Sequence, residues 1–219
     1  MPLSSAPEEH HGPCLEVVSA GHRFAGGPWL FRQVQHSFTP EAMTAIIGPS
    51  GSGKSTLLAA LGATLTLAEG HIHRHRIKRV ARVAQTAYGV PTRSVRDHLT
   101  LPLLITGTSR TDADLAVEPL AAQFGIDHLL AADYRHLSGG EAQRLMLARA
   151  VATRADLILA DEPTASLDAT NTHTVVQVLT QLTTSGAIVI IATHDPLVMG
   201  ACSQILDLAD ADRSANTCD

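Results

Sequence analysis

The amino-acid sequence predicts an α/β fold with a parallel sheet, because short apolar runs alternate with helical patterns along the chain. Three runs have the length and composition of buried strands: residues 45–47, 157–160 and 187–192. A glycine-rich loop follows the first run, the acids Asp161 and Glu162 follow the second, and His194 closely follows the third. Open α/β sheets bind ligands at the carboxyl ends of their strands, so one shared site is predicted there.

The segments between these strands carry helix signals. One helix is predicted from Thr56 to about Leu67, directly after the glycine-rich loop. Another is predicted before the third strand, because apolar residues from Val175 to Leu182 recur at helical spacing and Gly186 is a stop signal.

The chain is expected to form one domain over residues 14–208, between a flexible tail at 1–13 and a C-terminal tail at 209–219. The stretch of about 86–155 has mostly helical patterns, which predicts a helical subdomain inserted into the α/β core. The section near the N-terminus is rich in β-patterns and predicts a small antiparallel β-subdomain.

Composition limits the possible partners. The chain is 45% hydrophobic, which is typical of a globular protein, and its formal charge of −5 argues against a nucleic-acid surface. Three scattered cysteines, Cys14, Cys202 and Cys218, favour a reducing compartment without a disulfide framework or zinc site. No apolar run reaches the ~18–20 residues that cross a bilayer, and the N-terminus has no signal-peptide pattern. We therefore expect a cytosolic protein whose membrane contact comes only through a partner.

The glycine-rich loop reads GPSGSGKST and matches the phosphate-binding pattern GxxxxGK[ST]. A flexible linker is the alternative, but a strand precedes the loop and a helix follows it. Glycines let backbone N–H groups surround phosphate oxygens, Lys54 can reach the β- and γ-phosphates, and the Ser55 hydroxyl can ligate Mg²⁺. The loop predicts a P-loop NTPase core that binds ATP and Mg²⁺, with these candidate ligands: Gly48, Pro49, Ser50, Gly51, Ser52, Gly53, Lys54, Ser55 and Thr56.

Two acids at the end of the second strand indicate hydrolysis. Asp161 is the candidate that completes the magnesium site, and Glu162 is the candidate general base for an attacking water. An acidic pair could also simply begin a helix, where carboxylates interact favourably with the dipole. The strand before the pair favours the magnesium and base roles, and so favours an ATPase over a kinase.

The stretch from Leu137 to Arg144 reads LSGGEAQR. Ser138 and Glu141 have the spacing of a capping box, so an ordinary helix start would account for part of it. The whole motif, placed shortly before the second strand, resembles the signature of ABC transporter ATPases. The resemblance extends over about residues 14–208 and includes all the motifs of that family in order.

The resemblance implies further roles. Gln85 matches the glutamine that touches Mg²⁺ or the attacking water, His194 matches the histidine that contacts the γ-phosphate, and Asp168 lies in the segment that crosses the dimer. Phe24 is the candidate for stacking on adenine, with Trp29 as the second choice. The signature residues Ser138, Gly139 and Gly140 would complete the nucleotide pocket of a second chain.

The resemblance also implies partners and a location in the cell. We expect two copies to close around two ATP molecules and to drive a separate transmembrane permease, with the ATPase on the cytoplasmic face of the membrane. The stretch TRSVRDHLTLPLLITG is similar to the group of macrolide exporters, lipoprotein-release systems and haem exporters, which favours export. The substrate is not encoded in this chain.

The sequence departs from the family pattern in three places. The interval between Lys54 and Gln85 is short, which indicates a trimmed β-subdomain, and the usual glycine near Glu41 is absent. Three histidines at period two, His71, His73 and His75, would share one face of a strand. They are interpreted as a solvated face, and a metal or haem site is the alternative.

Two other functions stay open at this point. The chain could be a mechanical regulator that signals through a membrane partner without transporting a substrate. It could also be a soluble ABC ATPase that acts on DNA or ribosomes, but the coiled-coil insertions, paired cassettes and basic tails of that class are absent from the sequence.

Overall fold

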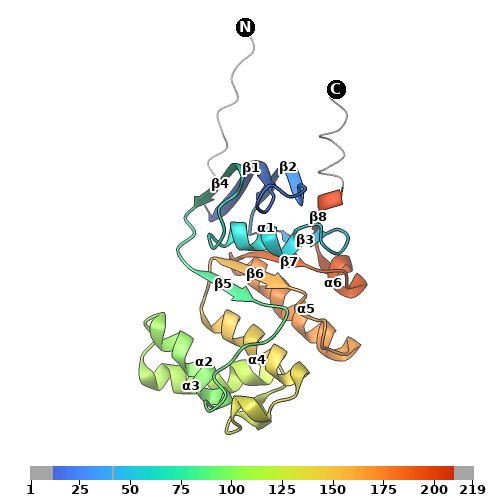
Figure 1. Cartoon of the computed structure of the whole chain (residues 1–219). Coiled ribbons are helices and arrows are strands. Elements are labelled where there is room, and N and C mark those ends of the chain that lie inside the picture. Colours follow the sequence, from blue (N-terminus) through green and yellow to red (C-terminus); the bar gives the residue numbers. More distant parts are fainter. Residues whose placement is uncertain (1–11, 41, 210–219) are drawn as a thin grey trace, which may run out of the picture.

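The computed structural model describes residues 12–40 and 42–209 of the chain. Glu41, Cys218 and nearly all of both expected tails lie outside the described residues. Helix α1 (Lys54–Leu61) lies between two sheets, and the remaining helices pack on the far side of the larger sheet (Figure 1).

The larger sheet has five strands in the order β5-β6-β7-β3-β8, and every neighbouring pair is parallel. Its strands are β3 (Met43–Ile47), β5 (Val80–Val83), β6 (Leu157–Asp161), β7 (Ile188–Ala192) and β8 (Gln204–Asp207). The three predicted strands are neighbours at its centre, and every residue of β7 is buried. The prediction of a parallel α/β core is confirmed, and so is the shared edge for the three strand ends.

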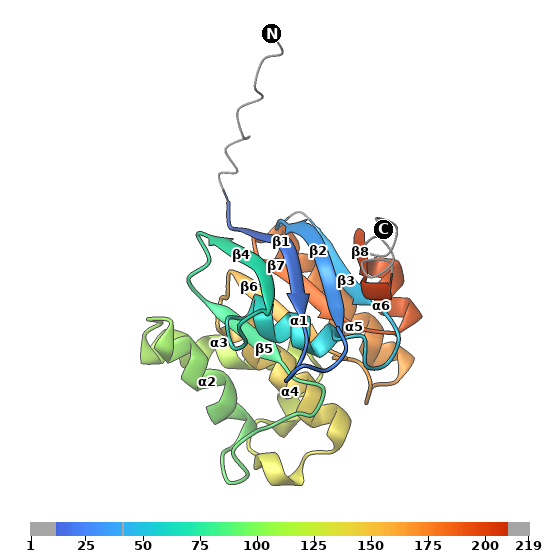
Figure 2. The same cartoon turned by 45° about the horizontal axis from the view of Figure 1, so that its top comes forward.

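The smaller sheet is antiparallel, with the order β2-β1-β4. Its strands are β1 (Cys14–His22), β2 (Phe31–Phe38) and β4 (Glu69–His75). Leu15, Phe31 and Phe38 are fully buried and belong to the same apolar cluster as Leu57 and Leu61 of α1. Figure 2 shows this sheet lying over α1, so burial of its inner face fixes the helix that follows the glycine-rich loop.

Helix α1 is shorter than the sequence predicted. It ends at Leu61 instead of continuing to about Leu67, and the Gly62 N–H donates to the Leu58 carbonyl. Arg74 of β4 donates to the carbonyls of Ala60 and Leu61 at 2.6 and 3.1 Å. A residue distant in sequence therefore satisfies the last carbonyls of α1, and the chain turns away from the helix to form β4.

The stretch predicted to be mostly helical contains α2 (Val95–Ile105), α3 (Arg110–Gln123) and α4 (Gly139–Ala152), with short 3₁₀ turns η1 (Asp127–Leu129) and η2 (Tyr134–His136). Each of the three helices begins at a serine whose hydroxyl accepts a backbone N–H: Ser94, Ser109 and Ser138. Helices α5 (Ala169–Thr184) and α6 (Pro196–Ala201) pack against the parallel sheet. Gly186 follows α5 with φ 93°, as the stop signal predicted.

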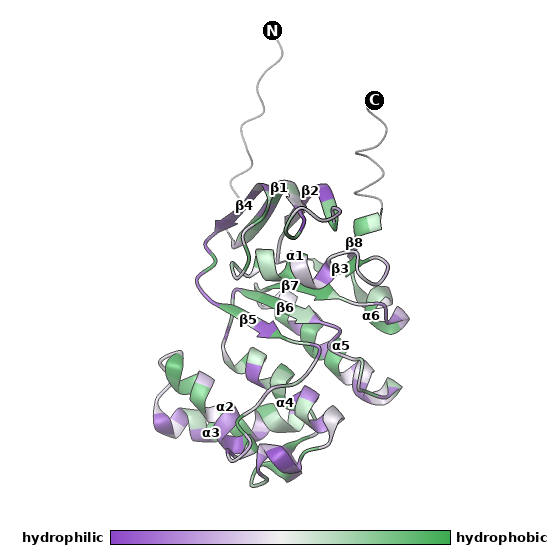
Figure 3. Ribbon diagram, in the orientation of Figure 1, coloured by the Kyte–Doolittle hydropathy of each residue, from purple (hydrophilic) through white to green (hydrophobic). Residues whose placement is uncertain are grey.

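Hydropathy follows this layering. In Figure 3 the central strands are mostly hydrophobic, whereas the helices far from the sheets alternate hydrophilic and hydrophobic residues. Among the described helices, none combines the length and the apolar character needed to span a bilayer.

The three alternating histidines are exposed on one face of β4. Neighbouring ring centroids are 6.4 and 6.3 Å apart, and His75 Nε2 lies 4.0 Å from Glu16 Oε2. Their exposure agrees with the interpretation as a solvated face. Within residues 12–40 and 42–209, no three His, Cys, Asp or Glu side chains are grouped closely enough to hold a metal ion.

Gly70 should be the least replaceable glycine of the small sheet. Its φ is +78°, and a Cβ there would stand 2.2 Å from the Ser19 carbonyl oxygen. Gly107 has a similar φ of +89° but open space around it, so Gly107→Ala isolates the backbone strain of ~1–2 kcal/mol. We expect Gly70→Ala to lower the free energy of unfolding clearly more than Gly107→Ala, as measured by urea denaturation. Equal losses would show that the contact with Ser19 relaxes without cost.

Candidate nucleotide-binding site

A pocket of about 700 Å³ opens at the carboxyl edge of the parallel sheet. It collects residues from the glycine-rich loop, the start of α1, the ends of β6 and β7, and two other segments of the chain. The lining residues are Phe24, Leu30, Gly48, Pro49, Ser50, Gly51, Gly53, Lys54, Ser55, Thr56, Gln85, Asp161, Glu162 and His194. Most of the candidate residues from the sequence therefore meet in one place; Ser52, Ser138, Gly139, Gly140 and Asp168 are not among the lining residues.

The loop owes its shape to two glycines that no other residue could replace without movement. A Cβ on Gly48 would stand 2.7 Å from Ser52 Oγ, and one on Gly53 would stand 2.8 Å from the Phe31 ring. Both glycines have positive φ, at 145° and 91°. Ser52 Oγ is itself buried without a hydrogen-bond partner among the described residues. The side chain of Ser52 thus fills the inside of the loop and does not face the pocket.

Helix α1 begins without a side-chain cap. Gly53 occupies the N-cap position in a left-handed conformation, and no acidic residue lies in the first turn. The first backbone N–H groups of α1 are therefore left for a ligand, and the positive end of the helix dipole favours an anion. This local geometry fits a phosphate group.

Lys54 lies across the mouth of the loop. Its ammonium donates to the carbonyls of Gly48 and Pro49 at 2.8 and 3.1 Å. An ammonium has three donors, so these two bonds leave one for an anion in the pocket. The positive charge is thereby held where the β- and γ-phosphates of a bound nucleotide would lie.

Glu162 and His194 form a pair that the sequence did not predict. His194 Nδ1 lies 2.8 Å from Glu162 Oε1, and the His194 backbone N–H donates to Oε2 at 3.4 Å. The Glu162 side chain is 10% exposed and the His194 side chain 81% exposed. The pairing orients the imidazole so that Nε2, on the other side of the ring, remains for a ligand.

The backbone of Glu162 is unusual. Its φ of 45° lies in the left-handed region, and its N–H donates to the Ala192 carbonyl at 2.8 Å. A non-glycine residue in this conformation carries strain, which residues at functional sites often do. Here the bond to the end of β7 holds the strained turn that directs the carboxylate toward His194.

Oxygen donors suited to Mg²⁺ line the same pocket. Asp161 is the last residue of β6 and half-buried, Ser55 is in the first turn of α1, and Gln85 lies just after β5. Carboxylate, hydroxyl and amide oxygens are hard ligands of the kind that Mg²⁺ takes. The donor set therefore fits this ion.

The signature residues form the predicted capping box. Ser138 Oγ accepts the Glu141 N–H at 3.4 Å, and Glu141 Oε2 accepts the Ser138 N–H at 2.7 Å. That backbone bond, more than any other contact, lowers the pKa of Glu141. Gly140 lies against the segment that leads to α5, since a Cβ there would stand 3.2 Å from the Ser166 carbonyl oxygen. The start of α4 and the segment before α5 are thus neighbours on the same chain.

Asp168 caps helix α5. Its carboxylate accepts the backbone N–H of Asn171 at 2.8 Å, and this bond lowers the Asp168 pKa. The carboxylate also accepts the Asn171 side-chain amide at 3.0 Å. Within this chain the Asp168 side chain therefore starts a helix.

The two aromatic candidates for the adenine have different surroundings. Phe24 is 57% exposed and lines the pocket, as Leu30 does. Trp29 is enclosed by Arg23 and Arg32, each with its guanidinium carbon 4.7 Å from the ring centroid, and does not line the pocket. Leu30 was not predicted, because an isolated leucine in a loop has no distinguishing pattern.

Three further polar residues, Thr164, Thr193 and Asp195, form hydrogen bonds around the histidine. Thr164 Oγ1 donates to Asp195 Oδ2 at 2.8 Å, and the Asp195 N–H donates to Thr193 Oγ1 at 3.0 Å. The first bond joins the turn after Glu162 to the turn that carries His194, and the second lies within that turn. The sequence signal for these residues was that they are polar and closely follow two buried strands. Which of them form hydrogen bonds depends on how the sheet brings the two strand ends together.

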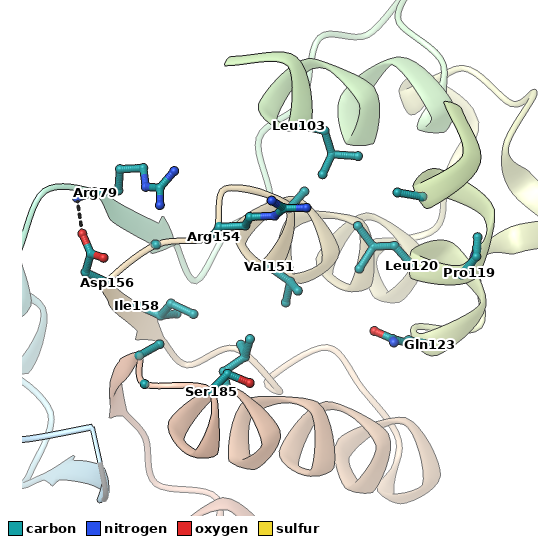
Figure 4. Close-up of a pocket in the computed structure, with 16 residues that line it drawn as sticks. Arg79, Leu103, Pro119, Leu120, Gln123, Val151, Arg154, Asp156, Ile158 and Ser185 are labelled. Carbon is teal, nitrogen blue, oxygen red and sulfur yellow. Dashed lines mark hydrogen bonds between the residues drawn. The ribbon is translucent and has the colours of Figure 1, made fainter. Parts of the chain in front are cut away.

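A second cavity of about 650 Å³ lies elsewhere, between α3, α4 and the end of α5 (Figure 4). Its lining includes Leu103, Leu120 and Val151, and its carboxylate, Asp156, accepts the N–H groups of Lys78 and Arg79. Asp156 precedes β6, so this cavity is at the amino ends of the strands. It contains no phosphate-binding loop, which leaves the first pocket as the candidate site.

Comparisons with known proteins show which family the chain resembles. The profile of the ABC transporter family matches residues 31–165. The chain is 32% identical over 205 residues to the macrolide export ATP-binding/permease protein MacB of Rhodopseudomonas palustris, covering 85% of this chain and 31% of that protein. It is 35% identical over 202 residues to the lipoprotein-releasing system ATP-binding protein LolD 2 of Caulobacter vibrioides, covering 85% and 89%.

Among solved structures, a bacterial ABC transporter cassette determined as a dimer is similar, with a TM-score of 0.79 and 26% identity over 89% of this chain and 94% of that one. The chain thus spans about a third of the macrolide-export relative but nearly the whole of the lipoprotein-releasing one.

Glu162→Gln should slow ATP turnover by roughly 10²–10⁴-fold, because an amide cannot accept a proton from water. ATP binding should persist, since the substitution keeps the size of the side chain. Turnover is measured by phosphate release and binding by calorimetry. Glu118→Gln is the control, because Glu118 is exposed on α3, outside the pocket. A Glu162→Gln variant with the wild-type rate would remove Glu162 from the role of base.

Proposed function

This chain belongs to the ABC transporter family and is one of its ATPases, and we propose that it dimerises around two ATP molecules to drive a separate membrane permease. The observation that supports the proposal is that the signature residues lie outside the nucleotide pocket of their own chain. The loop, Lys54 and the acids meet in one pocket, whereas Ser138 and the start of α4 lie outside it.

The glycine-rich loop and α1 would hold the triphosphate. Uncapped N–H groups of α1 and the free donor of Lys54 face the pocket, and Phe24 presents an exposed ring beside it. The ring is the proposed platform for the adenine. These contacts bind the substrate before any chemistry occurs.

Mg²⁺ would be held by Ser55, Asp161 and Gln85, whose side chains line the pocket. When bound, the ion neutralises charge on the β- and γ-phosphate oxygens. The remaining steps belong to residues of the chain itself.

Hydrolysis requires a base close to the γ-phosphate. Glu162 is proposed to take a proton from a water molecule as the water oxygen attacks the γ-phosphorus and ADP leaves. His194, held through Nδ1 by Glu162 at 2.8 Å, would present Nε2 to the γ-phosphate. One hydrogen bond thus joins the proposed base, Glu162, to the proposed phosphate-binding group, His194.

A second copy would complete each pocket. The N-terminus of α4 carries Ser138, Gly139 and Gly140 on the surface, with open space around Gly139. Across a dimer this helix end would approach the γ-phosphate bound by the other copy. Asp168, next to this helix start, would lie at the same interface. The similar cassette that was solved as a dimer supports this arrangement.

The permease is proposed to be a separate chain. The relative that this protein matches nearly end to end is named an ATP-binding protein of a lipoprotein-releasing system, and the macrolide relative is an export protein. Both names support export. The chain would then lie on the cytoplasmic face of the membrane, attached through the permease, with residues 14–208 as one ATPase domain and about 86–155 as its helical subdomain.

Ser138→Arg should abolish ATP hydrolysis while leaving ATP binding by the single chain intact. A large cation would occupy the place where the signature approaches the partner's nucleotide, whereas Lys54 and the loop are unchanged. Loss of the N-cap should itself cost ~0.5–2 kcal/mol of stability. Ser109→Arg is the matched control, because Ser109 caps α3 in the same way, accepting the Asp112 N–H at 3.1 Å.

Mixing Ser138→Arg with Lys54→Ala chains tests the shared site. One pocket of the mixed dimer combines an intact Lys54 with an intact Ser138, and the other carries both substitutions. ATPase activity is expected to rise above that of either variant alone. A Ser138→Arg protein with normal hydrolysis would contradict the dimer mechanism.

A further inference from the structure

Gln85 belongs to a segment that has little support of its own. From Ala84 to Ser94, between β5 and α2, the chain forms no helix and no strand beyond a single bridge to Asp133. Tyr88 and Val90 are 73% and 53% exposed. A segment with few buried apolar contacts opens easily, so a small number of polar contacts decides where Gln85 stands.

His98 supplies one of these contacts in the middle of the segment. The residue is 6% exposed and lies in the first turn of α2. Its Nε2 accepts the Val90 N–H at 3.0 Å, and its Nδ1 lies 2.7 Å from the Ser94 carbonyl oxygen. An N–H only donates and a carbonyl only accepts, so the neutral imidazole with its proton on Nδ1 satisfies both partners.

Tyr134 also contacts the same segment. Its ring centroid is 5.4 Å from that of His98, and a Cβ on Gly89 would stand 2.3 Å from the Tyr134 ring. The Tyr134 N–H donates to the Arg93 carbonyl at 2.9 Å. Tyr134 belongs to η2, which directly precedes the signature stretch from Leu137 to Arg144. The middle and the end of the segment are therefore bound to the chain that leads into α4.

The beginning of the segment is bound to α4 directly. Gln143, which is 2% exposed, donates through Nε2 to the Ala84 carbonyl at 3.3 Å. Gln85 thus lies between two attachments to the helical part of the chain. A displacement of the helical part would move Gln85 relative to the glycine-rich loop.

We propose that His98 is a positioning residue that fixes the segment from Ala84 to Ser94 and thereby sets where Gln85 stands in the nucleotide pocket. The inference rests on the role proposed above for Gln85 in ATP hydrolysis. His98 itself lines neither the pocket nor the second cavity. It acts through Val90, and the hydrogen bond accepted by Nε2 is the contact that matters.

Three substitutions distinguish the contributions of the two ring nitrogens of His98. His98→Gln can place an acceptor near the position of Nε2 and so keep the bond to Val90. His98→Asn can keep the donor near Nδ1 but is too short to reach Val90. His98→Leu fills a similar volume and keeps neither bond.

The first readout is amide exchange of Val90 in the full-length protein, followed by NMR or mass spectrometry without nucleotide. Exchange should be about fivefold faster or more in the Asn and Leu variants, from the loss of one hydrogen bond. The Gln variant should resemble wild type. The second readout is ATP hydrolysis, where kcat should fall roughly 5–10-fold in the Asn and Leu variants with little change in KM.

Thr100→Val is the matched control. Thr100 is 5% exposed on α2 and donates to the Arg96 carbonyl at 2.9 Å, so its loss removes a buried hydrogen bond that does not reach the segment. It should leave both readouts unchanged. A His98→Asn protein with wild-type exchange and kcat, or a Gln variant as impaired as the Asn variant, would overturn the proposal. Neither readout needs a permease, so failure to find a permease would count against the proposed function alone.

Discussion

The parallel pairing of β3, β6 and β7 is the constraint on which the site depends. In the sheet register Ala192 is opposite both Ile46 of β3 and Asp161 of β6. The glycine-rich loop, the acids and the turn that carries His194 therefore leave the sheet at one level. Because the central strands are buried on both faces, a shift of one residue would move each side chain from one apolar cluster to the other, so packing of the core fixes the relative heights of the functional groups.

Electrostatics then divides the pocket into two sides. The loop side offers an ammonium and the uncapped N-terminus of α1, and the strand side offers Asp161 and Glu162. A carboxylate as buried as Glu162 is costly without partners. His194 supplies these partners through its backbone N–H and its Nδ1. The hydrogen bond between Nδ1 and Glu162 Oε1 therefore stabilises the buried acid and also orients the imidazole. The contact between Glu162 and His194 thus contributes both to the stability of the turn and to the arrangement of the two side chains in the pocket.

The helical part of the chain is connected to the pocket by few contacts. The segment that carries Gln85 forms no strand pairing beyond a single bridge, and hydrogen bonds from α2, η2 and α4 hold it in place. The start of α4 lies beside the segment that leads to α5, outside the pocket of its own chain. Under the proposed mechanism one chain binds the nucleotide and a second copy completes the site.

Local sequence determined the phosphate loop, the capping box at Ser138 and the buried strands, because each depends on neighbours within a few residues: glycine conformation, a hydroxyl three residues before its partner, or a continuous apolar run. Residues distant in sequence decided the rest. Arg74 of β4 binds the last carbonyls of α1, and His194 pairs with Glu162. His98 showed no pattern that predicts its bond to Val90. Such contacts form only after the sheets and helices pack, since packing brings together side chains whose separation along the chain carries no signal.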